Sequence, residues 1–250
     1  MLVLLPPSET KRAGGTGAPL DLGTLALPQL TDERRAAVAA LVALSADPEA
    51  ATRVLKLSVR QAGEVAVNAA LSTAPTMPAI DRYTGVLYDA LDAATLEPAA
   101  RGWTGEHVLI QSAPFGPVGA LDAVPAYRLA AGTALPGIPP LRRHWAAPST
   151  AALAATDAPF VLDLRSEAYV ALAPVPASIP SAFVRVVTAG VDGTVRALNH
   201  FNKHAKGQLV RAMARSVAEI TSRADFFAWA ADAGWDARNG EVAGELQIVV

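Results

Sequence analysis

The chain opens with the segment MLVLLPPSETKR, residues 1–12. Its first five residues form an apolar run with the length of a buried strand, and the Pro-Pro pair that follows ends it because proline has no backbone N–H to donate. A polar run begins directly afterwards at Ser8, and polar groups after a buried strand often lie at a binding site. A second apolar strand is predicted at the other terminus, over 245–250. Strands at both ends favour one shared sheet.

The sequence between these strands predicts both helices and strands. Asp47-Pro48 has the pattern of a helix start, and Ser58 with Gln61 has that of a capping box. Helices are predicted over 32–46, 48–57, 58–71, 86–91, 166–169 and 202–220, and from 222 to Gly234; strands are predicted over 107–111, 160–164, 183–188 and 194–198, the last two as a hairpin. The region 75–148 is rich in Gly and Pro and is predicted to be mostly irregular. We expect a mixed α/β fold in which residues 1–250 form a single domain with a central sheet surrounded by helices.

Composition excludes several classes of protein. The chain has 250 residues, 52% of them hydrophobic, and no cysteine. It therefore has no disulfide, no catalytic thiolate and no cysteine metal site. The longest uncharged stretch, 168–184, carries three prolines, so no membrane-spanning helix is expected. The apolar start lacks the basic region and length of a signal peptide, and a cytoplasmic location is expected.

The charge of the chain is unevenly distributed. Its net charge is -2, but residues 185–223 contain seven Lys or Arg against two carboxylates. On a helical wheel, His204, Arg211 and Arg215 fall on one face. This stripe would suit phosphate contacts, or it is simply a solvated cationic face.

Lys206 falls inside the apolar stripe of the same predicted helix. An unpaired ammonium is costly to bury, so Lys206 either extends to solvent at the helix start or points into a polar pocket. In a pocket, desolvation would lower its pKa enough for acid-base or Schiff-base chemistry.

Three further sets of residues suit ligand binding. Asp163, Arg165, Ser166 and Glu167 lie at and just after the end of the apolar strand predicted over 160–164, where open sheets place ligand-binding groups. The loop pairs Arg82-Tyr83 and Tyr127-Arg128 combine an aromatic ring with a cation, which suits a base and its phosphate. Packing tyrosines, surface ion pairs and a helix cap would explain the same residues.

The sequence predicts neither a metal site nor a cofactor. Four histidines occur without HExxH or similar spacing, and the GGTG loop at 14–17 lacks the P-loop pattern.

Five segments, in order along the chain, resemble the YaaA family of peroxide stress response proteins. They are MLVLLPPSETK at 1–11, RYTGVLYDAL at 82–91, YRLAAG at 127–132, LDLRSEAY at 162–169 and HFNKHAKGQLVRA at 200–212. The resemblance implies a single-domain mixed α/β fold peculiar to the family, a cytoplasmic role in limiting damage from hydrogen peroxide and free iron, and DNA binding through a positively charged cleft. Carried over by motif, the cleft positions are Thr10, Lys11, Arg82, Tyr83, Tyr127, Arg128, Ser166, Tyr169, Lys203, Lys206 and Arg211.

One departure from the family pattern bears on function. Familiar members follow the first strand with SPAKT, whereas Glu9 replaces the lysine here and Lys11 comes two positions later. A carboxylate at this point repels DNA but is able to act as a general base.

Three hypotheses of function follow, and the sequence does not decide whether the protein is an enzyme. The third of them is an interaction protein with no site chemistry, which exposure of both Glu9 and Lys206 would favour. In the first, duplex DNA is the partner, with phosphate contacts from the cationic residues His204, Lys206, Arg211 and Arg215. In the second, the protein is an enzyme for a small anionic or nucleotide-like substrate, with tentative catalytic residues Glu9, Asp163, Tyr169 and Lys206. The second predicts that Glu9 and Lys206 share one pocket.

Overall fold

The N-terminal strand lies in the middle of the sheet that organises the molecule. The computed structural model describes residues 1–189, 195–197 and 199–250. In it β1 (Leu2–Leu5) pairs in parallel with β4 (Val108–Ser112) on one side and with β7 (Val161–Asp163) on the other. The predicted strands at 1–5, 107–111 and 160–164 are therefore confirmed to within a residue or two.

The C-terminal strand joins the same sheet. Strand order is β10-β11-β8-β7-β1-β4-β5, and the short strand β9 pairs with β8 outside this path. Strands β11, β8, β7, β1 and β4 run parallel to one another, while β5, β9 and β10 are antiparallel to their neighbours. The bounds of the remaining strands of this sheet are Gly116–Gly119 for β5, Ser181–Ala189 for β8, Val195–Ala197 for β9, Asp236–Asn239 for β10 and Glu245–Val249 for β11. The predicted hairpin is thus present as β8 and β9; its turn, at 190–194, and Leu198 lie outside the described residues.

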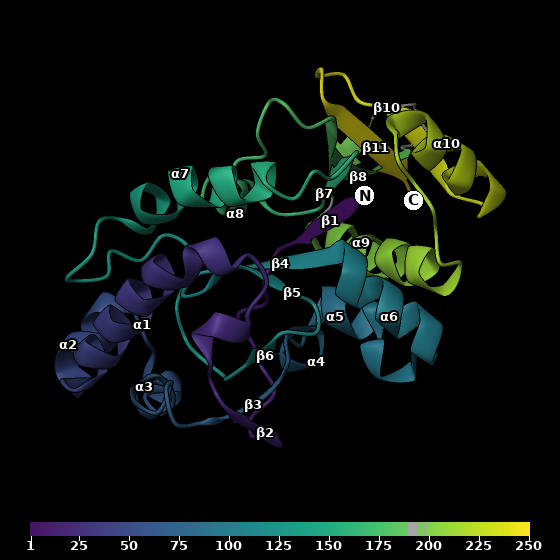
Figure 1. The fold of residues 1–250 in the computed structure, drawn as a ribbon. Helices are drawn as coiled ribbons and strands as arrows, with labels where there is room; N and C mark the ends of the chain where they lie inside the picture. The colour runs from purple at the N-terminus through teal and green to yellow at the C-terminus, as the bar shows by residue number, and fades with distance from the viewer. Residues whose placement is uncertain (190–194, 198) are drawn as a thin grey trace.

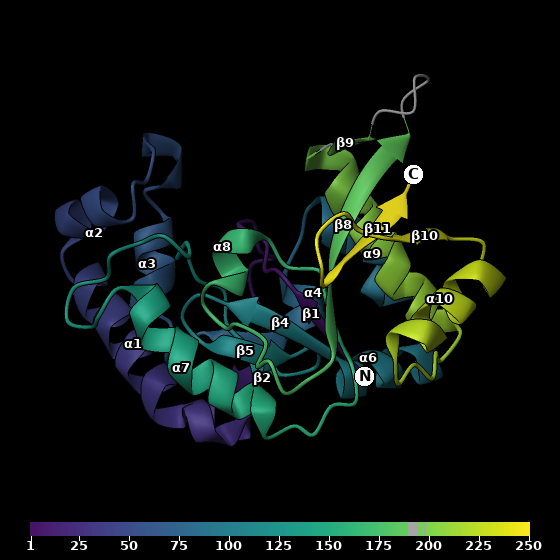
Figure 2. The same ribbon diagram turned by 90° about the horizontal axis from the view of Figure 1, so that it is seen from above.

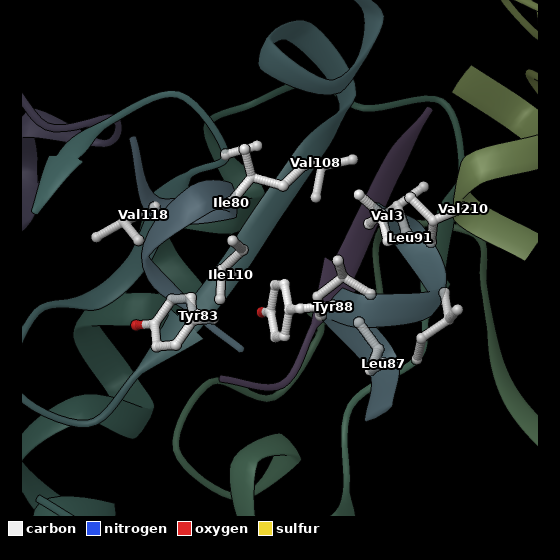
Figure 3. Close-up of a cluster of buried hydrophobic side chains, with 14 of the residues drawn as sticks. Val3, Ile80, Tyr83, Leu87, Tyr88, Leu91, Val108, Ile110, Val118 and Val210 are labelled. Atoms are coloured by element: carbon white, nitrogen blue, oxygen red, sulfur yellow. The ribbon is translucent and has the colours of Figure 1, made fainter. Parts of the chain in front are cut away.

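Helices cover both faces of the sheet (Figures 1 and 2). Successive side chains of β1 point to opposite faces, as in any strand. Leu4 packs in a cluster with Leu153 of helix α7, whereas Val3 belongs to the larger core. Figure 3 shows Val3 beside Leu91 and Val210, which come from two helices on that face. Because both faces are covered, β1 is apolar along its whole length.

Most predicted helices are confirmed. The helices are α1 (Thr31–Ser45), α2 (Pro48–Val54), α3 (Glu64–Ala69), α4 (Ala79–Arg82), α5 (Val86–Leu91), α6 (Pro98–His107), α7 (Leu141–Ala154), α8 (Glu167–Val170), α9 (Asn199–Arg215) and α10 (Arg223–Asp232). Asp47 caps α2 by accepting from the backbone N–H groups of its first turn, as its sequence pattern predicts. Helix α9 begins three residues before the expected start at Asn202 and ends before Ile220, because Val217 adopts a left-handed backbone with φ of 48°.

The region 75–148 is more regular than predicted. It contains α6, the first half of α7, and two strands of a small sheet of β2 (Gly17–Pro19), β3 (Pro75–Pro78) and β6 (Ala123–Val124). Helix α7 continues through Pro148, a residue that normally breaks a helix. Burial of Trp145 and Leu153 on the core side of this helix offsets that cost.

These observations confirm a mixed α/β fold with a central sheet. No helix among the described residues is both long and apolar enough to cross a membrane.

Candidate functional site

The loops that follow β1 and β7 meet above the carboxyl ends of the parallel strands. Two cavities lie there, of about 710 and about 420 Å³. Both are lined by Pro6, Val86, Leu87, Ser166 and Lys203, so they form one continuous groove. We call the larger one the Lys206 cavity and the smaller one the Thr10 cavity, after the residue that lines only that part of the groove. This is the position at which open α/β sheets bind ligands.

Lys206 points into a pocket and does not extend to solvent. Its residue is only 6% exposed, and its Nζ donates a hydrogen bond of 3.0 Å to the carbonyl of Leu164. The ammonium also lies 5.5 Å from the ring centroid of Phe183. Burial lowers the pKa of Lys206 to about 8, with Asp163 acting in the opposite direction. A buried ammonium with hydrogen-bonding capacity to spare is suited to binding an anion.

The two arginines of the Lys206 cavity are already paired with carboxylates. Arg165 donates two hydrogen bonds to Asp163, of 2.8 and 2.6 Å, and both residues are buried. Arg185 lies 2.7 Å from Glu245 and 3.3 Å from Glu167. Among the described residues, no carboxylate forms an ion pair with Lys203 or Lys206, although both line this cavity.

Asp163, a predicted catalytic residue, is therefore held in a bidentate ion pair with Arg165. It also accepts a hydrogen bond of 3.0 Å from the backbone N–H of Arg165. With both carboxylate oxygens occupied, Asp163 serves to hold the loop after β7 against the sheet.

Glu9 and Lys206 line different parts of the groove, and the described residues show no contact between them. Glu9 lines the Thr10 cavity, and its side chain is 70% exposed and ion-paired to Arg128 at 2.8 Å. Tyr169 lines the same cavity and is half-buried; burial raises its pKa above the ordinary tyrosine value. The carboxylate that was expected to act with Lys206 is therefore paired with Arg128 in this structure.

Lys11 holds the loop after β1 in place through hydrogen bonds to its backbone. Its Nζ donates to the carbonyls of Ser8 and Glu9, at 2.9 and 3.2 Å, and lies 4.1 Å from the ring centroid of Tyr127. Burial, with Arg128 as the second cause, lowers the pKa of Lys11 to about 7. Tyr83 and Tyr127 are both buried, with their hydroxyls 2.9 Å apart. Their rings are therefore packed in the core and are not free to stack on a base.

Two arginines that were expected to bind phosphate use their guanidinium groups in hydrogen bonds within the protein. Arg82 is fully buried and donates to the carbonyls of Arg12, Pro75 and Val124. Arg211 donates to the carbonyls of Leu91 and Asp92 and to Thr95 Oγ1, at the C-terminus of α5 and just after it. Both guanidiniums fix loops by satisfying backbone carbonyls, and neither residue lines the groove.

His204 and Arg215 are exposed on α9, outside the lining of the groove. The side chain of His200 lies outside the described residues. The described residues contain no group of three or more His, Asp or Glu side chains placed to hold a metal ion.

The comparison with known proteins decides the family. The model of the family described as "Peroxide stress protein YaaA" matches residues 1–236. The chain belongs to the YaaA family. Similar proteins include a UPF0246 protein of Corynebacterium efficiens, 48% identical over 226 residues that make up 89% of this chain and 88% of the relative. Others are UPF0246 proteins of Corynebacterium glutamicum, 44% identical over 94% of this chain and 93% of the relative, and of Streptomyces coelicolor, 47% identical over 85% and 82%.

In this YaaA protein, four of the five resembling segments contribute to the groove. They are the loop after β1, the start of α5, the loop after β7 with α8, and the first turns of α9. The fifth contributes Arg128, which holds Glu9.

Some groove residues were not predicted from the sequence. They are Ser8, Thr84, Phe183, Arg185 and Asn202. Ser8 and Arg185 carried a signal, because Ser8 opens the polar run after β1 and Arg185 begins the basic region. The others are recognisable only once the chain is folded.

Proposed function

We propose that this peroxide stress family protein acts by binding a phosphate-bearing anion in the groove, with Lys203 and Lys206 as its main contacts. The observation that carries the proposal is the pair of lysines, three residues apart on α9, that line one cavity with no carboxylate partner among the described residues. Residues at this spacing lie on neighbouring positions of one helix face. Two adjacent ammonium groups match the charge of a phosphate monoester.

The dimensions and lining of the Lys206 cavity agree with a ligand the size of a nucleotide. Its volume of about 710 Å³ falls in the range of small-molecule sites. Apolar walls from Val86, Leu87 and Phe183 surround the two lysines, and a low local dielectric strengthens an ion pair with the ligand. Because Glu9 and Lys206 line different cavities, the proposal includes no acid-base step between them.

Duplex DNA is the second candidate ligand. The exposed basic residues Lys203, His204 and Arg215 lie along α9, and the first of them also lines the groove. A protein bound to DNA there would lie close to the molecule that peroxide and iron damage, which agrees with the protective role that the family resemblance implies. Arg211 is left out of this interface because the protein itself occupies its guanidinium.

The decisive experiment compares a nucleotide with DNA on matched variants. Adenosine 5′-monophosphate is titrated calorimetrically, and fluorescent duplex DNA is titrated at two salt concentrations, against the wild type, Lys206→Met and Arg215→Gln. The proposal predicts nucleotide binding that Lys206→Met weakens by about tenfold or more and Arg215→Gln leaves unchanged. The DNA candidate predicts steeply salt-dependent binding that Arg215→Gln weakens. Nucleotide affinity unaffected by Lys206→Met would refute the first candidate.

A further inference from the structure

The Thr10 cavity contains a cluster of hydroxyl groups drawn from two distant segments. Thr84 Oγ1 donates to Thr10 Oγ1 at 3.0 Å, and Ser8 Oγ lies 3.3 Å from the same oxygen. The backbone N–H of Thr10 also points to Ser8 Oγ, at 3.3 Å. All three residues line the cavity, and each is exposed or half-buried. The cluster is therefore accessible to a ligand.

These hydroxyls keep hydrogen-bonding capacity after their contacts with one another. A hydroxyl group has one proton to donate and two lone pairs to accept. Thr10 Oγ1 also donates to the carbonyl of Thr84 at 3.5 Å and so holds the cluster together, whereas the hydroxyls of Ser8 and Thr84 keep lone pairs that a ligand can use. Gly85 stands beside them with a φ of +94°, and a side chain there would bring its Cβ within 3.3 Å of Ser8 Oγ. Glycine thus satisfies the backbone geometry and leaves the hydroxyls uncovered.

Glu9 adds an acceptor to the same cavity. Arg128 binds its Oε2 at 2.8 Å, which fixes the carboxylate in place. No hydrogen bond or ion pair among the described residues involves Oε1. A carboxylate oxygen that lines the same cavity as the hydroxyls is suited to accept from the hydroxyl groups of a ligand. It is poorly suited to a second phosphate, which it would repel.

We propose that the Thr10 cavity binds the hydroxyl groups of a sugar, so that the ligand of the groove is a sugar phosphate or a nucleotide. This inference rests on the proposed function: the phosphate lies at Lys203 and Lys206, and the sugar extends past Ser166 into the Thr10 cavity. Lys203 and Ser166 line both cavities, which places the phosphate next to the hydroxyl cluster. The carboxylate that departs from the family pattern then contributes to sugar recognition.

The test compares two phosphate monoesters of equal charge and carbon number. Ribose 5-phosphate carries sugar hydroxyls, and n-pentyl phosphate carries none. Both are titrated calorimetrically against the wild type, against Thr10→Val and Ser8→Ala, and against Thr73→Val, which removes an exposed hydroxyl of the loop before β3, outside the groove.

The wild type and Thr73→Val should bind ribose 5-phosphate about tenfold more tightly than n-pentyl phosphate, since two net hydrogen bonds are gained. In Thr10→Val and Ser8→Ala this preference should fall to about threefold or less, with the affinity for n-pentyl phosphate unchanged. Equal affinity of the wild type for the two esters would overturn the sugar site and leave the proposed function standing. If neither ester binds, or if Lys206→Met binds both as well as the wild type does, the proposed function fails and the sugar site with it.

Discussion

The replacement Lys206→Met isolates the energetic cost of the buried ammonium. Methionine keeps the unbranched shape of the side chain and removes its charge. Burial lowers the pKa of Lys206 from 10.5 to about 8. At about 1.4 kcal/mol for each tenfold change in proton affinity, keeping this side chain charged in the folded state costs about 3 kcal/mol at pH 7. The variant also loses the hydrogen bond to the Leu164 carbonyl, which is worth about 1 kcal/mol. We therefore expect Lys206→Met to be about 2 kcal/mol more stable than the wild type at pH 7.

This difference should depend on pH in a defined direction. Because the folded-state pKa is the lower one, the unfolded wild type binds more protons than the folded wild type between pH 8 and 10.5, and its stability rises across this window. The advantage of the variant should shrink through the same window and vanish about 1.5 pH units above the folded-state pKa; near the upper end of the window the variant should be about 1 kcal/mol less stable, because only the lost hydrogen bond then remains. Lys11, whose pKa is also lowered by burial, is present in both proteins, so its contribution cancels.

Urea denaturation of both proteins at several pH values from 7 to 10 measures the difference. Lys203→Met is the matched control, since this exposed lysine lies on the same helix and its replacement should change stability by less than about 0.5 kcal/mol. A variant less stable than the wild type at pH 7, or a stability difference constant from pH 7 to 10, would refute the reasoning.

Three further replacements test the supports of the groove. Gly207→Ala should destabilise the protein by about 1–3 kcal/mol in urea denaturation, because the new Cβ would lie 2.1 Å from the Leu87 carbonyl oxygen. Gly102→Ala is the control: its Cβ would meet no atom within 4 Å, so the replacement should be neutral or slightly stabilising. Asp163→Asn should cost about 3–5 kcal/mol, since it leaves the buried Arg165 guanidinium without its charge partner; an unchanged melting temperature would contradict this role. Arg211→Ala should lower the melting temperature and leave nucleotide affinity in the groove unchanged. A loss of nucleotide affinity without a loss of stability would show instead that this arginine contacts the ligand.

Local patterns were sufficient for most of the elements. The apolar run at β1 and the Asp47 cap of α2 are properties of a few neighbouring residues, so they can be recognised without the fold. Helix α7 could not be predicted, since Pro148 opposes a helix locally and only packing against distant parts of the chain overcomes it. The early end of α9 at a left-handed valine is likewise decided by tertiary contacts.

The sequence by itself determined the fold class, the family and the segments that meet at the groove, because these depend on apolar periodicity, capping patterns and motif order. Only the tertiary structure decided which of the charged residues remain available to a ligand. Arg82 and Lys206 show the reason. Each needs a partner when buried, and those partners are backbone carbonyls far away in the sequence: Val124 for the first and Leu164 for the second. The arginine uses all its guanidinium nitrogens on backbone carbonyls, whereas the lysine makes one hydrogen bond within the described part of the chain and lines a cavity, so of these two residues Lys206 is the one able to bind an anion.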